Sequence, residues 1–232
     1  MEVFADIRFI LEDDLKQYRQ ALINRYQPIK KIAPKTVMSL FGQPVTNLFF
    51  LLEGMVKIYT SNEQGYSRLI GFHGPNTLFA LDAIIEGANA VVTTEAVTPL
   101  KVLSITVEQL EQMGREIPGF TLDLLKYYGN VLRLMCFDSE IQSINAVPLR
   151  LYRFFMLYQK SNIYQKNGCI LLNQDSIASA INASRVQVAR ICAEWKKAGW
   201  IRIGRGKIWL EDFAALTQAM GAVEVDSEIG KK

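Results

Sequence analysis

The feature that most constrains the fold is a long stretch in which almost nothing breaks a helix. From Pro118 to Asn145 only Gly119, directly after the proline, and Gly129 disfavour a helix, and proline suits the first turn of one. About 27 residues at 1.5 Å each would form a helix roughly 40 Å long. A helix of this length separates the chain into two parts with different residue patterns.

The part before the long helix has the pattern of short strands. Between Pro28 and Ile105, β-branched and aromatic runs alternate with glycines and polar turns. The clearest runs are residues 47–60, 67–72 and 91–105, and residues 62–65 between the first two are typical of a hairpin turn. Several short strands at this spacing predict an all-β roll or barrel.

Helical patterns flank the predicted strands. Leu11, Leu15, Tyr18 and Leu22 have the spacing of one face of a short amphipathic helix over residues 11–25. Downstream, Thr106 and Gln109 form a capping box that opens another short helix. Beyond the long helix, Pro148 opens a helix over residues 149–159, and the polar residues 161–168 predict a loop.

Apolar residues recur along the long helix at alternating spacings of four and three. They are Leu124, Tyr128, Val131 and Met135, and Asp138 interrupts the series. This spacing is that of a seam against a second helix. It predicts a homodimer formed through the long helix. A helix that packs only on its own domain is the alternative.

The last third of the chain has two capped helices joined by a tight turn. Asn173 is a typical N-cap of a first short helix, and the turn follows at Asn182 and Ala183. Ser184 and Gln187 form a capping box at the start of a second helix that runs to about Lys197. Its expected buried face is Val188, Ile191, Cys192 and Trp195. This order predicts a helix-turn-helix, which presents the second helix to the DNA major groove.

Two apolar runs follow, around a basic, glycine-rich tip. Residues 200–203 and 208–210 predict the strands of a hairpin wing, with Arg205 and Lys207 at its tip. These two cations suit DNA phosphates, and Gln174 is a further phosphate candidate.

Four residues at the start of the second helix are candidates for reading bases. Arg185 and Arg190 can each fork onto guanine, with a phosphate contact as the alternative for either. Val186 can contact a thymine methyl, and Gln187 can contact adenine or phosphate unless it serves only the capping box. The predicted DNA-binding residues are Gln174, Ser184, Arg185, Val186, Gln187, Arg190, Arg205 and Lys207.

The charge is concentrated in this same part of the chain. Residues 148–210 carry eleven Lys or Arg and two acids, Asp175 and Glu194, whereas the whole chain has a net charge of only +3. A strongly basic module on an otherwise acidic chain is typical of a polyanion-binding protein. A solvated basic face without a partner is the alternative.

Other classes of protein are disfavoured. Cys136, Cys169 and Cys192 lack the spacing of a disulfide framework or a zinc site, and no apolar run is long enough for a membrane span. The N-terminal residues lack a secretory signal, so we expect a cytoplasmic protein. A cupin-type metalloenzyme needs clustered histidines, and His73 is the only histidine. We expect no enzyme activity, no metal site and no cofactor.

The capped helices and the wing resemble the cyclic-AMP receptor protein and fumarate-nitrate-reductase regulator (Crp/Fnr) family of bacterial transcription regulators. The resemblance covers nearly the whole chain and implies an α+β protein. Residues 1–117 would be a β-roll sensor (a cupin-like double-stranded β-helix). Residues 118–146 would be the dimerisation helix and hinge, and residues 147–232 the winged helix-turn-helix. It implies a homodimer that binds an inverted repeat in double-stranded DNA and contacts RNA polymerase.

The recognition helix departs from the family pattern at one position. The family's Ser-Arg-Glu-x-Val-x-Arg is matched by residues 184–190, with Val186 in place of the glutamate. A glutamate accepts a hydrogen bond from cytosine, which valine cannot do. We therefore expect an A·T-rich site.

The sensor departs further. Ala80-Leu81 stand where cyclic-AMP binders have Gly-Glu, and Ala90-Val91 where they have Arg-Ser. A buried phosphate without such partners costs several kcal/mol, so we expect no cyclic-nucleotide binding. The predicted effector pocket is apolar and consists of Phe79, Leu81, Ala90, Val91, Tyr128, Val131, Met135 and Cys136.

The preferred effector is an apolar or aromatic small molecule. Residues 74–78 and 126–128 are similar to the branch of the family that senses halogenated aromatics, although Leu81 and Val131 replace the lysines of that branch. The iron–sulfur branch needs an N-terminal cysteine cluster, and the haem branch needs axial ligands that a lone histidine does not supply. A ligand-free sensor, a redox-responsive sensor and a cyclic-nucleotide-binding module remain alternatives.

Overall fold

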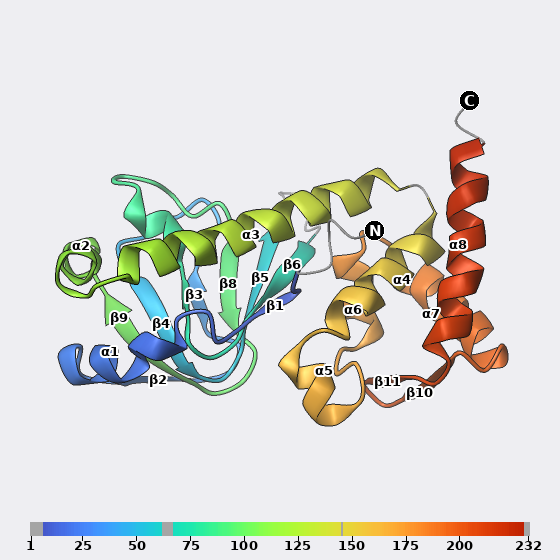
Figure 1. The fold of residues 1–232 in the computed structure, drawn as a ribbon, viewed down its shortest axis with the longest axis horizontal. Helices are drawn as coiled ribbons and strands as arrows, with labels where there is room; N and C mark the ends of the chain where they lie inside the picture. Colours follow the sequence, from blue (N-terminus) through green and yellow to red (C-terminus); the bar gives the residue numbers. More distant parts are fainter. Residues whose placement is uncertain (1–6, 62–66, 145, 230–232) are drawn as a thin grey trace. The chain divides into compact units, whose positions relative to one another are not determined.

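The computed structural model describes residues 7–61, 67–144 and 146–229 and divides into two compact units (Figure 1). The first unit is Ile10–Arg133, and the second contains the chain from Leu134 onward together with the residues before Ile10. The hairpin turn predicted at residues 62–65 and residue 145 of the predicted hinge lie outside the described residues.

Two antiparallel sheets make the body of the first unit. One has the strand order β1-β6-β5-β8-β3 and the other β2-β9-β4-β7. The strands are β1 (Ile10–Leu11), β2 (Lys30–Ile32), β3 (Val37–Ser39), β4 (Leu48–Glu53), β5 (Val56–Ser61), β6 (Ser67–His73), β7 (Thr77–Phe79), β8 (Thr93–Ala96) and β9 (Leu100–Ile105). Among the described strands only β1 pairs in parallel, with β6. The predicted roll of short strands is confirmed.

The N-terminal segment is built differently from the predicted helix. Leu11 lies in β1, and Asp13 has a positive φ of 63°, so no helix can run through it. Helical structure starts only with the short 3-10 turn η2 (Lys16–Tyr18), followed by α1 (Arg19–Arg25). The helix predicted over residues 11–25 is therefore wrong in its first half, because Leu11 completes a sheet.

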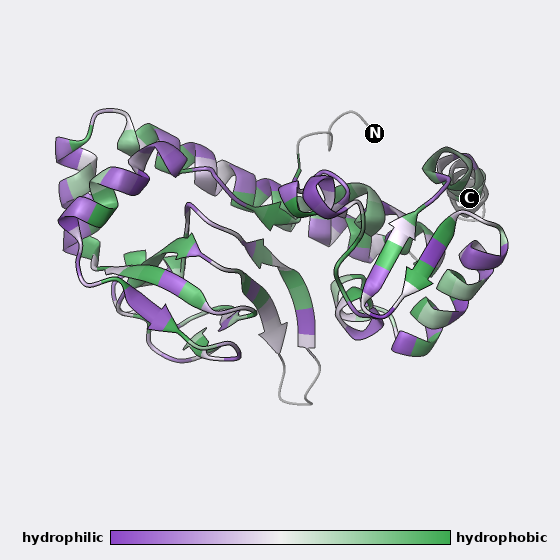
Figure 2. Cartoon of the chain, turned by 90° about the horizontal axis from the view of Figure 1, so that it is seen from below, coloured by the Kyte–Doolittle hydropathy of each residue, from purple (hydrophilic) through white to green (hydrophobic). Residues whose placement is uncertain are grey.

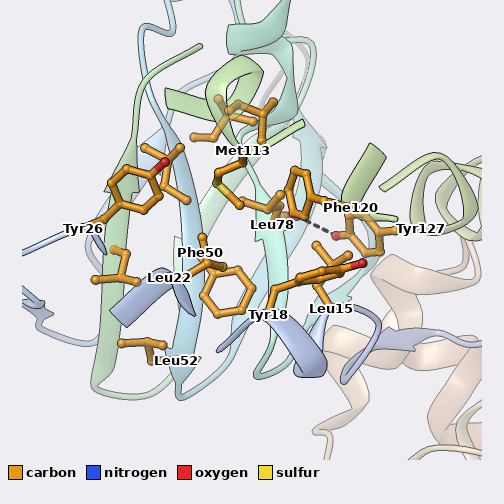
Figure 3. Packing of buried hydrophobic residues seen from close by; sticks show 14 of the residues in the cluster. Leu15, Tyr18, Leu22, Tyr26, Phe50, Leu52, Leu78, Met113, Phe120 and Tyr127 are labelled. Atoms are coloured by element: carbon orange, nitrogen blue, oxygen red, sulfur yellow. Dashed lines mark hydrogen bonds between the residues drawn. The ribbon is translucent and has the colours of Figure 1, made fainter. Parts of the chain in front are cut away.

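The apolar spacing of this segment nevertheless identified core residues. Leu11, Leu15, Tyr18 and Leu22 are all buried in one cluster with residues of the roll and of the long helix. Figure 3 shows Leu15, Tyr18 and Leu22 packed with Phe50 and Phe120. We call this set the main core cluster.

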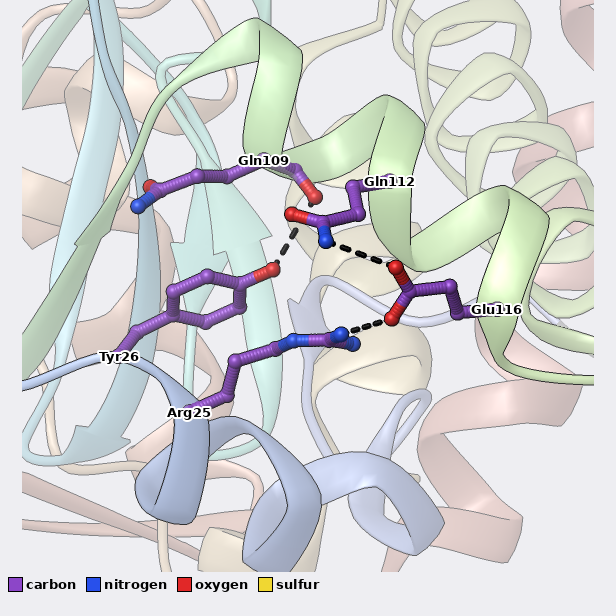
Figure 4. Close-up of polar contacts among 5 residues, drawn as sticks. All are labelled: Arg25, Tyr26, Gln109, Gln112 and Glu116. Carbon is purple, nitrogen blue, oxygen red and sulfur yellow. Dashed lines mark hydrogen bonds and ion pairs between the residues drawn. The ribbon is translucent and has the colours of Figure 1, made fainter.

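Helix α2 (Val107–Glu116) opens with the predicted capping box. Gln109 N–H donates to Thr106 Oγ1 over 3.2 Å, and Thr106 N–H donates to Gln109 Oε1 over 2.9 Å. Polar contacts attach α2 to α1: Arg25 pairs with Glu116, and the Tyr26 hydroxyl donates to the Gln109 carbonyl (Figure 4).

The long helix α3 (Phe120–Ser143) is confirmed, but the seam predicted along it is wrong for two of its residues. Leu124 and Val131 pack against the main core cluster of their own roll. Other leucines of α3 face outward: Leu122, Leu125 and Leu132 are 58%, 63% and 64% exposed. The roll uses the predicted stripe because a helix beside a sheet must bury its own apolar face first.

The second unit continues from α3 with helices and one hairpin. Its elements are α4 (Val147–Tyr158), α5 (Asn162–Asn167), α6 (Gln174–Ala180), α7 (Arg185–Lys197), β10 (Ile201–Gly204), β11 (Lys207–Leu210) and α8 (Phe213–Ile229). Pro148 lies in the first turn of α4 as predicted. The loop predicted at residues 161–168 is wrong, because Ser161 caps α5 and Gly168, with φ of 64°, ends it.

No helix in the described part of the chain is long and apolar enough to cross a membrane.

Candidate nucleic-acid interface

The two helices of the predicted reader begin at the predicted caps. The Asn173 side chain accepts from Ser176 N–H over 2.8 Å and starts α6. Ser184 and Gln187 bond reciprocally, over 3.1 and 2.9 Å, and start α7. These local bonds satisfy N–H groups that a helix leaves without partners at its first turn. The cap fixes where α7 begins and therefore which side chains lie at its end.

A tight turn joins α6 to α7. Asn182 adopts a left-handed backbone, with φ of 51°, and Ala183 N–H donates to the Ala178 carbonyl. Asparagine tolerates this conformation better than most residues. The predicted inner face of α7 is confirmed, since Val188, Ile191, Cys192 and Trp195 are all buried.

The opposite face of α7 presents the predicted base-reading residues to solvent. Arg185, Val186 and Arg190 are exposed, and Val186 is 77% exposed. Among the described large hydrophobic residues Val186 is the most exposed, so its methyl groups are open to contact with a partner. Gln187 is also exposed, but its Oε1 already accepts from Ser184 N–H, as the capping alternative required.

The wing is a tight hairpin of β10 and β11. Ile201 pairs with Leu210 and Gly204 with Lys207, so Arg205 and Gly206 form the two-residue tip. Gly206, the second residue of the tip, has a positive φ of 67°, which glycine adopts at no steric cost. Hydrophobic and hydrophilic residues alternate along the hairpin (Figure 2). The predicted phosphate-binding residues Arg205 and Lys207 are both exposed at this tip.

A third cation of the wing is engaged within the protein. The Arg202 guanidinium lies 3.7 Å from the centre of the Trp209 ring, and its Nε donates to Glu211 Oε1 over 2.6 Å. Arg150 and Arg153 are likewise committed, to the Ile144 and Asn182 carbonyls and to Glu140. Some of the eleven Lys and Arg residues in this basic stretch therefore stabilise the fold and are not available to a ligand.

A cavity of about 290 Å³ lies between the starts of α6 and α7 and the wing. Gln174, Arg185 and Lys207 line it, so three of the predicted DNA-binding residues come together there. Asp175 also lines it, and its Oδ1 is 3.7 Å from Arg185 Nε. Sequence reasoning did not select Asp175. The available signal was its place as one of two acids in the basic stretch.

The eight residues of the predicted effector pocket lie in different surroundings. Phe79 is buried in a small apolar cluster of the roll, whereas Leu81 and Val131 are partly buried against the main core cluster. Ala90 is buried, Tyr128 is half-buried and Val91 is exposed. Met135 is half-buried and Cys136 exposed, and both belong to the second unit. Burial, followed by the charge of Asp82, raises the pKa of Tyr128 to about 12.

The carboxylate of Asp82 lies beside Val91, one of the two residues that stand in place of the family's phosphate-binding Arg-Ser pair. Ala80 has a left-handed backbone, with φ of 59°. Two residues later, Asp82 Oδ2 accepts from Val91 N–H over 3.1 Å. An anionic ligand at this N–H would meet the Asp82 charge.

His73 is buried and bonds to the long helix. Its Nδ1 is 2.9 Å from the Tyr127 hydroxyl. Figure 3 shows the other bond of this hydroxyl, which donates to the Leu78 carbonyl. Since the tyrosine has one proton to give, the histidine Nδ1–H is the donor in the first bond. Burial lowers the pKa of His73 to about 3, so the ring is neutral at pH 7. These contacts give the chain's single histidine a structural role.

Two domain families match parts of this chain. The cyclic nucleotide-binding domain matches residues 29–116, and the Crp-like helix-turn-helix domain matches residues 149–219. The first match covers most of the roll. The second covers α6, α7 and the wing.

Curated relatives match over most of their length. The global nitrogen regulator of Synechocystis is 28% identical over 76% of this chain and 81% of its own. The CRP-like cAMP-activated global transcriptional regulator of Mycobacterium tuberculosis is 23% identical over 85% of this chain and 90% of its own. The solved c-di-GMP-responsive global regulator CLP of Xanthomonas campestris has the same fold, with a TM-score of 0.72 at 15% identity over 84% of this chain and 98% of its own.

Proposed function

The chain belongs to the Crp/Fnr family of DNA-binding transcription regulators, which are not enzymes, and from this premise we propose three specific properties. The protein binds an inverted repeat as a homodimer. It reads the repeat with Arg185, Val186 and Arg190. It responds to a small molecule other than cyclic AMP.

The observation that carries the proposal is the exposed start of α7. Two arginines and an apolar residue project from a capped helix whose other face is buried. Arginine can fork onto guanine, and valine can contact a thymine methyl but cannot accept from cytosine. This supports an A·T-rich half-site. Arg205 and Lys207 on the wing supply phosphate contacts, which position the protein without reading sequence.

Substitution of Arg185 tests the reading role. Arg185→Ala should weaken binding to the preferred site by about 1–3 kcal/mol and relax discrimination at one base. Lys207→Ala should weaken binding evenly across sequences and reduce the salt dependence by about one counterion. Lys196→Ala, at the far end of α7, is the control. Fluorescence anisotropy with matched and mismatched duplexes measures all three. Equal loss on every sequence for Arg185→Ala would refute base reading by this residue.

A second copy of the chain is the proposed partner of the exposed face of α3. Leu122, Leu125 and Leu132, with Gly129 between them, follow alternating spacings of three and four. This is the repeat of a two-helix seam. An inverted repeat requires the two recognition helices of a dimer to lie about 34 Å apart, one turn of DNA.

Charge placed in this stripe tests the dimer. Leu125→Glu and Leu132→Glu should each shift sedimentation from dimer to monomer and abolish cooperative binding to the inverted repeat. Leu40→Glu makes the same change at a half-exposed leucine of the roll and should leave the dimer intact.

A cysteine offers a second test of the dimer. Cys136 lies four residues after Leu132, on the same stripe, and is exposed. A mild oxidant should therefore link two copies, and Cys136→Ser should prevent the link.

The proposed effector is apolar or aromatic and binds beside Leu81, Tyr128 and Val131. These side chains are only partly buried, and Asp82 disfavours an anionic ligand near Val91. Selection of bound DNA from a random pool, with and without aromatic ligands and cyclic AMP, tests this proposal. Enrichment of an inverted repeat only with cyclic AMP would overturn the effector proposal and leave the reader intact. Regulation through RNA polymerase in the cytoplasm completes the proposal.

A further inference from the structure

We propose that Asp175 is a positioning residue that determines the specificity of Arg185. It holds the Arg185 guanidinium by its Nε edge and leaves the two terminal nitrogens for a base. The inference rests on the proposed base-reading role of Arg185.

The geometry of the pair suits this role. Asp175 lies in the first turn of α6, and Arg185 is the first residue of α7. Asp175 Oδ1 is 3.7 Å from Arg185 Nε, and the two side chains are 65% and 67% exposed. A guanidinium carries its donors in a rigid planar fork, so a carboxylate at the Nε edge orients the fork without occupying its end. The end is the part that can span O6 and N7 of guanine.

The charge of Asp175 has a second consequence. The carboxylate lines a cavity with Arg185 and Lys207, where the protein is expected to meet the DNA backbone. A negative charge there repels phosphate on every DNA sequence alike, whereas the orienting contact helps only where a guanine is present. Specificity commonly combines such a repulsive element with an attractive one. Asp175 therefore lowers binding to random DNA and raises discrimination.

The chain offers a matched control. Glu194 is the other acid of residues 148–210, and it is also exposed. It lies nine residues after Arg185 on α7, which at 1.5 Å per residue puts it about 13 Å further along the helix axis, out of reach of the Arg185 side chain. Asp175→Asn and Glu194→Gln remove the same charge without changing side-chain size. Only Asp175→Asn removes the contact with Arg185.

The experiment uses the full chain and the DNA site selected from a random pool. Anisotropy titrations with Asp175→Asn, Glu194→Gln, Arg185→Ala and the double variant Asp175→Asn/Arg185→Ala compare three duplexes. One is the selected site, one carries a substitution at the base where Arg185→Ala loses discrimination, and one is random. Thermal melting confirms that each variant is folded.

Asp175→Asn should bind random DNA about 2- to 5-fold more tightly and lose about 2- to 5-fold discrimination at that base, the range of an exposed ion pair. Glu194→Gln should leave discrimination unchanged. In the Arg185→Ala background, Asp175→Asn should cause no further loss of discrimination. Asp175→Glu keeps the charge and should retain the weak binding to random DNA.

Two outcomes would overturn the inference. One is an equal effect of Asp175→Asn and Glu194→Gln on discrimination. The other is a loss of discrimination by Asp175→Asn that persists without Arg185. A different result would refute the base-reading role of Arg185 itself: Arg185→Ala would keep full discrimination while the protein still selects an inverted repeat.

Discussion

The winged unit and the roll differ in where their functional side chains lie: those of the winged unit are exposed to solvent, and the polar pair of the roll is buried. In the winged unit, Arg185 and Val186 project into solvent while Val188 and Trp195 of the same helix are buried beneath them. In the roll, the polar groups of His73 and Tyr127 face inward and bond to each other. The candidate DNA-binding residues therefore form an exposed surface over a packed core, whereas the hydrogen bond between His73 and Tyr127 is part of the core of the roll.

The chain carries a natural probe for separating the two units. Its three tryptophans are Trp195, Trp200 and Trp209, and all of them lie in the second unit. Intrinsic tryptophan fluorescence therefore follows the winged unit, and far-UV circular dichroism follows the whole chain. Hydrogen exchange of peptides from β6 and β7 follows the roll.

The largest expected effect lies under the reading face. Trp195 is buried and meets Phe155 edge to face, with ring centroids 5.7 Å apart. Trp195→Ala should lower the free energy of unfolding of the winged unit by about 3–5 kcal/mol. Urea unfolding followed by the fluorescence of Trp200 and Trp209 measures it. Val186→Ala, on the exposed face of the same helix, should leave that free energy unchanged and weaken only DNA binding. If both variants lowered the free energy of unfolding by similar amounts, Val186 would contribute to the stability of the fold and would not act only in DNA binding.

Features that depend on residues close in the sequence were predicted more accurately than contacts between distant segments. The helix caps at Asn173 and Ser184 and the wing turn at Gly206 depend only on residues close in the sequence, so the sequence predicts them. Helix α5 was missed although Ser161 and Gly168 mark its two ends. The segment has no apolar periodicity, and a six-residue helix is too short to show one, so only its two caps could have indicated it.

Long-range packing was less accessible. Leu124 and Val131 have the spacing of a partner seam, yet they pack on their own roll, because spacing does not say which of two surfaces a stripe will meet. Leu11 likewise completes a sheet with β6, a strand about sixty residues further along the chain. The predicted pocket residue Phe79 became core for the same reason. Its neighbours come from strands that no local pattern connects.

The hydroxyl of Tyr127 joins two polar groups inside the roll. Tyr127→Phe removes the hydroxyl between His73 Nδ1 and the Leu78 carbonyl and leaves both groups buried with one bond fewer. The cost should be about 1–3 kcal/mol of unfolding free energy. Circular dichroism in urea, with hydrogen exchange of β7, measures it. Tyr128→Phe is the control, since Tyr128 is only half-buried. A loss no larger than that of Tyr128→Phe would mean that the bond contributes little to the roll.

Acid should weaken the roll through His73. Burial lowers its folded-state pKa from 6.5 to about 3, so between these values the unfolded chain binds the extra proton. The stability is fully present above about pH 6.5 and falls below it by at most about 1.4 kcal/mol per pH unit. Urea unfolding at about pH 7, 6 and 5 measures the slope, before most carboxylates titrate. His73→Gln should flatten it, and an unchanged slope in that variant would assign the acid sensitivity to other groups.

The smallest effect compares one exposed ion pair from each unit. Arg202 pairs with Glu211 and also stacks on Trp209, whereas Lys101 of the roll pairs with Glu53 at 2.9 Å on an exposed edge. Arg202→Gln should cost about 0.5–1 kcal/mol, because the guanidinium loses the aromatic face as well as the carboxylate. Lys101→Gln should cost less than about 0.5 kcal/mol, as solvent screens an exposed pair. Tryptophan fluorescence in urea measures the first and circular dichroism the second. If the two costs are equal, stacking adds nothing to the wing, and the pairing of β10 with β11 alone holds Arg205 and Lys207 in place.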